Sequence, residues 1–104
     1  MGKATGFIEV FGLAAAFVAV DAGCKAANVT VETLDKNKPG NADALPVPLI
    51  VLIKFRGTVE DVKAAVDAAA NAVKDLTGVI STHIIANTEE STEKMLKLNA
   101  FDKN

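Results

Sequence analysis

The apolar residues in the first part of the chain change their spacing, and each change predicts a new element. Phe7, Ile8, Val10 and Phe11 form a short run typical of a strand, which ends at Gly12. From Leu13 the spacing becomes helical, because Leu13, Phe17, Val20, Cys24 and Ala27 recur at steps of four and three. Val29, Val31 and Thr33 then alternate with polar residues, which predicts a second strand that ends near Leu34.

The second part of the chain repeats this order of elements. Leu49–Phe55, interrupted only by Lys54, is the best candidate for a central strand. Thr58 is a suitable N-cap, with Asp61 three residues further on. A second helical stripe follows, and Gly78 ends the helix. Val79–Ile85 is the fourth predicted strand. Residues Thr88–Leu98 form a short polar helix capped by Thr88 or Ser91. The stripe consists of Val59, Val62, Val66, Ala69, Val73 and Leu76.

This order predicts an α/β (α+β) fold of the ferredoxin-like βαββαβ type with a short C-terminal helix. An internal echo supports two related halves, since Ala19-Val20-Asp21-Ala22 recurs as Ala65-Val66-Asp67-Ala68. The right-handed crossover rule places the two long helices on one face of the sheet. The other face must be covered by the terminal helix or by a neighbouring molecule.

Composition favours a single domain that associates with other copies. The 104 residues fit one domain over 1–104, with a core at about 5–98, a loop insertion at about 36–48 and a tail at 99–104. Half of the residues are hydrophobic and the mean hydropathy is +0.28. Small monomers rarely expose large apolar patches, so we expect part of this apolar surface to contact other subunits.

Charge and cysteine usage exclude several classes of partner. The net charge is −2 with acidic and basic residues mixed, and Trp and Tyr are absent, so neither a cationic face nor a stacking platform for nucleic acid is expected. The apolar stretch Leu13–Val20 is too short to span a membrane, and no signal peptide is visible. The single cysteine, Cys24, fits a reducing cytoplasm and is expected to be a small core residue.

No pattern of catalytic or metal-ligating residues stands out. His83 is the only histidine and lies within a predicted strand without a cysteine nearby in sequence, which favours a structural role. Glu60, Asp61 and the glutamates of the last helix suit helix N-termini rather than catalysis. We therefore expect no catalytic residues, no metal, no cofactor and no enzymatic activity. Two features remain, Lys25 near the end of the first helix and Pro46-Val47-Pro48 before the central strand.

The chain resembles single-domain shell proteins of bacterial microcompartments, of the hexameric type. The resemblance covers about residues 5–96. It rests on the joint order of several short segments: Gly6-Phe7-Ile8-Glu9-Val10, Asp21 to Lys25, Ala27-Asn28-Val29, Arg56-Gly57, Val62-Lys63-Ala64-Ala65 and His83-Ile84-Ile85. It implies a cyclic homo-hexamer that tiles into a polyhedral shell in the cytoplasm, together with other shell proteins and around encapsulated enzymes.

The resemblance also assigns roles to individual residues. It implies that Lys25, Asn28 and Asn87 lie at hexamer edges, and that Pro46, Val47 and Pro48 line a central pore for small metabolites. A Pro-x-Pro pore with a longer loop resembles the subgroup found with glycyl-radical enzyme compartments. Some members of that subgroup have cysteine where this chain has Val47 and hold an iron–sulfur cluster there. Ala86-Asn87-Thr88 replaces a segment that in the family often contains an arginine.

Two other functions fit the same fold. A ferredoxin-like regulatory module would bind a small molecule between subunits. An enzyme of the acylphosphatase type would need an arginine and an asparagine that converge on phosphate, and Arg56 is the only arginine of the chain.

Overall fold

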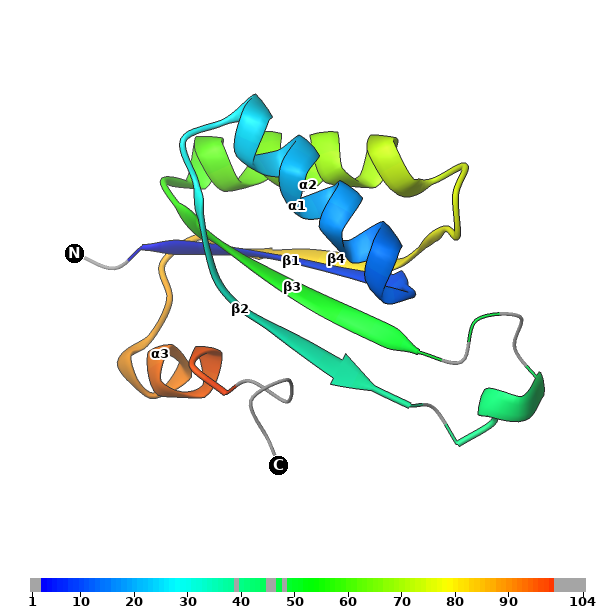
Figure 1. The fold of residues 1–104 in the computed structure, drawn as a ribbon. Coiled ribbons are helices and arrows are strands. Elements are labelled where there is room, and N and C mark those ends of the chain that lie inside the picture. Colours follow the sequence, from blue (N-terminus) through cyan, green and yellow to red (C-terminus); the bar gives the residue numbers. More distant parts are fainter. Residues whose placement is uncertain (1–2, 39, 45–46, 48, 99–104) are drawn as a thin grey trace.

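The computed structural model of the chain describes residues 3–38, 40–44, 47 and 49–98. The described residues form a βαββαβ core followed by one more helix, in the order predicted (Figure 1). The elements are β1 (Ala4–Phe11), α1 (Leu13–Ala26), β2 (Thr30–Asn37), a short 3-10 helix (Ala42–Ala44), β3 (Ile50–Gly57), α2 (Val59–Val73), β4 (Val79–Ile85) and α3 (Glu90–Leu96).

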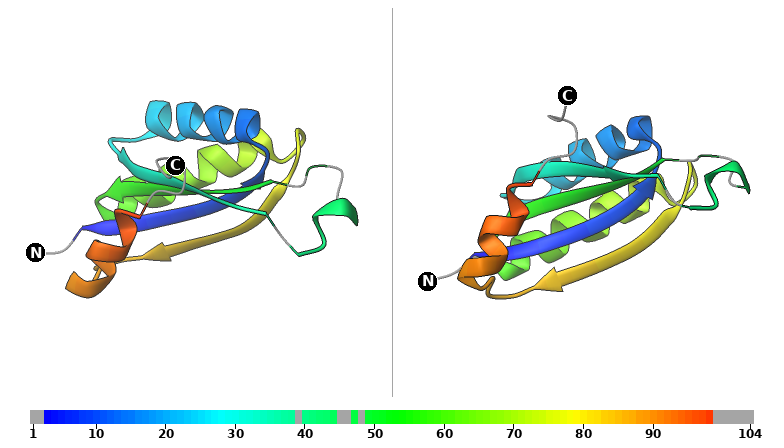
Figure 2. Two further views of the ribbon diagram at one scale, coloured as in Figure 1. Left: turned by 60° about the horizontal axis from the view of Figure 1, so that its bottom comes forward. Right: turned by 90° about the horizontal axis from the view of Figure 1, so that it is seen from below.

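The four strands form one antiparallel sheet in the order β2-β3-β1-β4. The third predicted strand is therefore central, as expected, and it pairs with β1 and β2. Helices α1 and α2 lie side by side on one face of this sheet, whereas α3 lies on the other side (Figures 1 and 2). This arrangement confirms the predicted fold class and the placement of both long helices on one face.

The core lies between the sheet and the two long helices. Its largest fully buried side chains come from β1, β3 and α2, and include Phe55, Ile8, Ile53 and Val62. On α1 the buried residues are small, namely Ala15, Ala16, Ala19 and Gly23. A Cβ at Gly23 would come within 2.5 Å of the Phe55 ring and 3.1 Å of the Ala65 carbonyl oxygen. Small residues on α1 therefore allow it to pack closely against β3 and α2.

Several predicted boundaries change in the structure. Strand β2 continues to Asn37, whereas a loop was predicted from Asp35, because pairing with β3 extends through Asn37 and Ile50. The predicted caps of the last helix were wrong: Glu89 is the N-cap, and its side chain accepts a hydrogen bond from the Ser91 amide. The cap of α2 is confirmed, because the Thr58 hydroxyl accepts from the Asp61 amide at 3.1 Å.

The far face of the sheet is partly covered by α3, which lies near the start of β1 and the end of β4 (Figure 2). Thr88, in the connection before α3, is buried and shares a 2.7 Å hydrogen bond between its hydroxyl and that of Thr5 on β1. This bond fixes the chain where it turns from β4 toward α3. Among the described residues no helix is long and apolar enough to cross a membrane.

Candidate functional site

The segment before β3 contacts the junction of β1 and α1. Gly12 ends β1 with a φ of 88° and donates its amide to the Leu49 carbonyl at 2.8 Å. A Cβ at Gly12 would come within 3.2 Å of the Val47 side chain, which is half-buried. The structure thus seats Val47 against Gly12, while the other two residues predicted to line a pore, Pro46 and Pro48, lie outside the described residues.

The residues predicted to lie at hexamer edges are all exposed. Lys25, in the last turn of α1, forms an ion pair with Asp21 at 2.8 Å, and the hydrogen bond with Asp21 raises the pKa of Lys25. Asn28 lines a groove of about 590 Å³ together with Ala86, the residue before Asn87. The fold therefore brings the end of α1 and the end of β4 to the same part of the surface, although they are far apart in sequence.

The prediction that Cys24 is a core residue was wrong, because its side chain is exposed. The residues of α1 that face the core are Ala15, Ala16, Ala19 and Gly23, so Cys24 lies on a different face of the helix. Partial burial, and then the nearby Asp21 carboxylate, raise the pKa of the Cys24 thiol. A raised pKa disfavours the thiolate, so the exposed thiol is not activated as a nucleophile.

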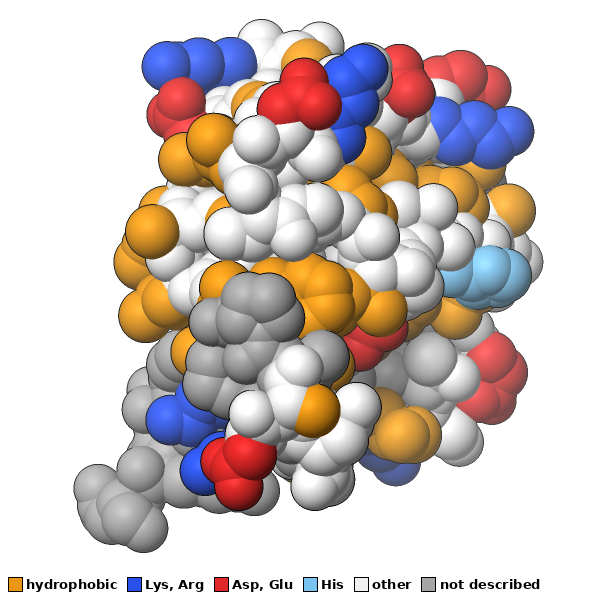
Figure 3. Space-filling model, turned by 90° about the vertical axis from the view of Figure 1, so that its right-hand side faces the viewer, with side chains coloured by type: hydrophobic (Ala, Val, Ile, Leu, Met, Phe, Trp, Pro, Cys, Tyr) orange, Lys and Arg blue, Asp and Glu red, His pale blue; other side chains and the backbone are white. Residues whose placement is uncertain are grey.

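Apart from Met95 and Leu98 on and after α3, the large exposed apolar side chains among the described residues lie on α1, after α2 and on β4. On α1, Leu13, Phe17 and Val18 are 38%, 60% and 41% exposed. Leu76, after α2, and Ile80, on β4, are also exposed. Figure 3 shows hydrophobic side chains spread across the end of the molecule next to the His83 side chain. Helix α1 packs mainly over β3, whereas β4 is an edge strand that α2 covers, so the α1 residues and Ile80 lie toward opposite edges of the sheet.

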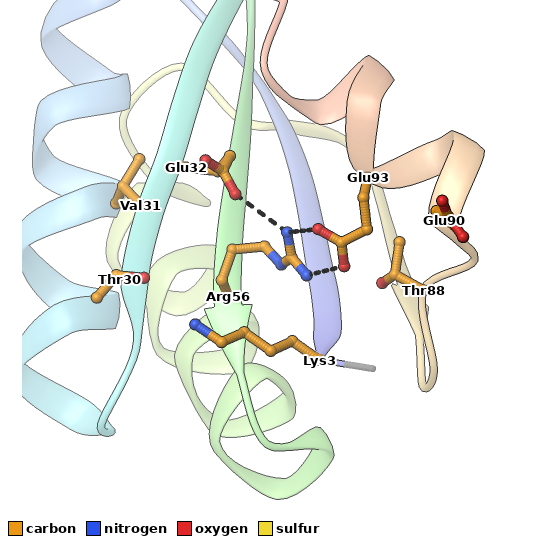
Figure 4. Close-up of a pocket in the computed structure, with 8 residues that line it drawn as sticks. All are labelled: Lys3, Thr30, Val31, Glu32, Arg56, Thr88, Glu90 and Glu93. Atoms are coloured by element: carbon orange, nitrogen blue, oxygen red, sulfur yellow. Dashed lines mark hydrogen bonds and ion pairs between the residues drawn. The ribbon is translucent and has the colours of Figure 1, made fainter. Parts of the chain in front are cut away.

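The sequence did not predict a buried ionic cluster on the far face of the sheet. Arg56 on β3 is only 4% exposed and donates two hydrogen bonds to the carboxylate of Glu93 on α3, one of them at 2.7 Å (Figure 4). The same guanidinium donates to Glu32 at 3.0 Å and to the Ala4 carbonyl at 3.3 Å. The bond to Glu93 is the main cause that raises the pKa of Arg56.

A second buried cation holds the C-terminal end of α3. Lys54, also 4% exposed, donates to the carbonyls of Leu96 at 3.2 Å and Leu98 at 2.9 Å. Thr33 on β2 donates to the same two carbonyls. Burial lowers the pKa of Lys54, opposed by the charges of Asp35 and Glu32. A cation at this end also complements the helix dipole.

A bulge in β2 brings Glu32 and Thr33 to the same face of the sheet. Val31 pairs with Phe55 and Leu34 pairs with Ile53, so Glu32 and Thr33 together oppose Lys54 alone. An extra residue in one strand re-aims the side chains next to it. Both Glu32 and Thr33 therefore reach the face that carries Lys54 and Arg56. The alternation of apolar and polar residues in the sequence gives no signal for such a bulge.

The cluster borders a hollow of about 700 Å³, but its chemistry is that of ion pairing within the chain. Figure 4 shows Arg56 extended between Glu32 and Glu93, with Lys3 beside it and Glu90 turned outward. No group of three or more potential metal-ligating side chains occurs within the described part of the chain. His83 is exposed on β4, where it pairs in register with Phe7.

Comparison with known proteins adds independent information. The sequence profile of the BMC domain matches residues 4–88. The chain is 38% identical over 100 residues to "Carboxysome shell protein CcmK1" of Thermosynechococcus vestitus, covering 94% of this chain and 80% of that protein. It is 36% identical over 94 residues to "Bacterial microcompartment shell protein PduA" of Citrobacter freundii, covering 90% and 91% of the two chains.

A solved structure shows the same fold. The crystal structure of a microcompartments protein from Desulfitobacterium hafniense DCB matches with a TM-score of 0.71 at 23% sequence identity. The match covers 93% of this chain and 48% of that chain, so this chain spans about half the length of that protein.

Proposed function

The chain belongs to the BMC domain family, and on this premise we propose that it is a structural shell protein of a bacterial microcompartment without a catalytic site of its own. The match to the family over residues 4–88 and the names of the related shell proteins support this role. In this proposal residues 1–104 form one shell domain located in a microcompartment shell in the cytoplasm. Its partners are further copies, other shell proteins of the compartment and the enzymes they enclose.

The copies associate head to tail into a closed ring of six. A heterologous interface, in which one side of a subunit contacts a different side of the next, generates a ring when the rotation closes. The two separate sets of exposed apolar residues are the observation that supports this arrangement, since Leu13 and Phe17 lie on α1 and Ile80 lies on β4. In this ring the α1 side of one copy packs against the β4 side of the next.

The segment before β3 faces the ring axis in this proposal. Pro46, Val47 and Pro48 then line a central pore that small metabolites cross. The lengthened loop and the Pro-Val-Pro sequence support membership of the subgroup found with glycyl-radical enzyme compartments. Because Val47 has no thiol, the pore of this protein binds no iron–sulfur cluster.

Lys25, Asn28 and Asn87 lie where neighbouring rings meet edge to edge. Their exposure and the groove shared by Asn28 and Ala86 are consistent with contact between molecules. The resulting sheet of rings is the wall of the shell.

Sedimentation and electron microscopy of the purified protein test this proposal. We expect six-subunit rings with little monomer, and flat sheets at higher protein concentration. Phe17→Ser should shift the protein toward monomers, because it removes an apolar side chain from the proposed ring interface. Met95→Ser is the matched control, since Met95 is 65% exposed on α3 and should leave the rings intact. A stable monomer of the parent protein at micromolar concentration would contradict the proposal.

A further inference from the structure

Helix α3 has little apolar contact with the rest of the molecule. It spans seven residues, Glu90–Leu96, and Leu96 is its one buried residue. Met95 and the following Leu98 are both more than half exposed. A helix of two turns is not stable alone in water, so α3 depends on the surface against which it packs.

That surface holds α3 mainly through polar contacts at two points. In the middle of the helix, Glu93 accepts two hydrogen bonds from Arg56. At its end, the Leu96 and Leu98 carbonyls accept hydrogen bonds from Lys54 and Thr33. The donors Lys54 and Arg56 are two residues apart on β3, so both side chains lie on the same face of the sheet, the face opposite α1 and α2.

Detaching α3 from the sheet costs less free energy than unfolding the main core. Water would replace the partners that residues 93–98 supply to Arg56 and Lys54, while Glu32 and Asp35 on β2 remain beside these cations. The hydration recovered by the two buried cations offsets the lost ion pair with Glu93 and the lost hydrogen bonds. Helices α1 and α2, in contrast, cover the fully buried side chains of β1 and β3, which are costly to expose. The two faces of the sheet therefore differ strongly in local stability.

We propose that α3 is a separately opening segment, that the Arg56–Glu93 pair controls its opening, and that the sheet, α1 and α2 stay folded when it opens. In the open state β3 exposes Lys54 and Arg56 on this face. Arg56 keeps Glu32 and Lys54 keeps Asp35, both on β2, but Arg56 has lost the Glu93 carboxylate and Lys54 has lost the Leu96 and Leu98 carbonyls. The fold thus contains a device that changes the charge of one face without unfolding the domain. The inference rests on contacts within one chain and is independent of the shell role.

Amide hydrogen exchange of the assembled protein at neutral pH tests this inference. In the parent, peptides from residues 90–96 should exchange at least about a hundred times faster than peptides from β1 and α2, because they open locally. Glu93→Gln keeps the shape of the side chain but removes its charge. It should speed exchange in α3 a further tenfold or so, the effect expected from weakening a charge-assisted contact. Exchange in β1 and α2 should not change.

Glu90→Gln is the matched control. Glu90 lies on the same helix and beside the same hollow, but among the described residues it forms no ion pair. Both variants lose a favourable charge from the first helical turn, so Glu90→Gln should change exchange in α3 far less than Glu93→Gln does. The inference is overturned if α3 in the parent exchanges as slowly as β1. It is also overturned if Glu93→Gln accelerates β1 and α2 as much as α3, or if Glu90→Gln acts like Glu93→Gln.

Discussion

At the residue scale, the identity of small side chains decides how closely the elements pack. Gly23 on α1 faces Phe55 on β3 and the backbone of Ala65 on α2. Gly23 and Ala69 occupy matching places, each four residues after the alanine that begins the repeated Ala-Val-Asp-Ala segment. Both are buried. The internal echo of the sequence therefore corresponds to a small buried residue at the same place on each helix.

Gly23→Ala should destabilise the protein. Alanine is favoured over glycine within a helix by about 1 kcal/mol, but the new Cβ would lie 2.5 Å from the rigid Phe55 ring. Overpacking of this kind costs about 1–3 kcal/mol, so we expect a net loss of roughly 1 kcal/mol, measured by urea denaturation. Gly40→Ala is the control, since a Cβ at Gly40 has nothing within 4 Å. A Gly23→Ala variant as stable as the parent would show that α1 can shift to accept the methyl group.

The buried face of α1 was predicted wrongly from the sequence, and there is a physical reason for this. On the most hydrophobic stripe, Leu13, Phe17 and Cys24 are exposed, and Val20 and Ala27 are only partly buried against the core. The fully buried face consists of alanines and a glycine. Hydrophobicity alone does not distinguish a face that packs within the chain from one that packs against another subunit. Close helix packing requires small residues, and their low hydrophobicity weakens the periodic signal.

At the element scale, local patterns predicted the strands and the long helices well, but not how α3 is held. Periodicity located β4 over Val79–Ile85 as observed, and the Thr58 cap fixed the start of α2. The roles of Lys54 and Arg56 depend on the β2 bulge and on where α3 folds back. Both are properties of the register between distant segments, so the sequence showed only two charged residues near the end of an apolar strand.

Acid should release α3. The hydrogen bonds from Arg56, and then the charges of Arg56, Lys97 and Lys3, lower the pKa of Glu93 from 4.5, while burial opposes them. Glu32, across Arg56, and Glu90, beside the same hollow, are the nearby acidic groups. The Glu93 carboxylate therefore binds a proton more weakly when α3 is packed on the sheet than when α3 is open. Glu93 stabilises the packed state fully above about pH 4.5, and this stabilisation is lost as the pH falls through the lower pKa that Glu93 has in the packed state.

Methyl NMR signals of Leu96, followed from pH 7 to pH 3, measure this release. They should move toward exposed values in acid, while signals of Val66 in the core remain unchanged. In Glu93→Gln the acid transition of Leu96 should be absent, because the titrating group has been removed. A transition that persists in this variant would assign the acid response to another carboxylate.

At the scale of the whole molecule, the order of elements was sufficient to predict the topology. The βαββαβ order, the right-handed crossovers and the echo between the halves led to the observed sheet with both long helices on one face. The pore role proposed for Val47 and the edge role proposed for Lys25 come from the family resemblance. They depend on contacts between copies, and the geometry of a single chain does not contain those contacts.

Val47→Cys tests whether this position faces the ring axis. Because Cys24 is exposed, the variant should be made in a Cys24→Ser background, which removes the other thiol. If Val47 lies near the axis, oxidation should link subunits within one ring, and anaerobic reconstitution with iron and sulfide should give visible absorbance from thiolate-bound clusters. Cys24→Ser alone should show neither effect. Rings without any linkage between subunits would place Val47 away from the axis.

Lys25→Ala should weaken the assembly of rings into sheets without affecting the rings or the fold. Lys25 is exposed, and its ion pair with Asp21 joins two side chains that are 76% and 64% exposed. Such a surface pair contributes little to folding, so the thermal midpoint should stay nearly unchanged. Electron microscopy should then show rings with fewer or smaller sheets. Lys63→Ala, which removes another exposed lysine from α2, should leave sheet formation unaffected. If Lys25→Ala instead splits the rings into monomers, Lys25 belongs to the interface within a ring, and the α1 side of the subunit contacts its neighbour through the end of the helix rather than through Leu13 and Phe17.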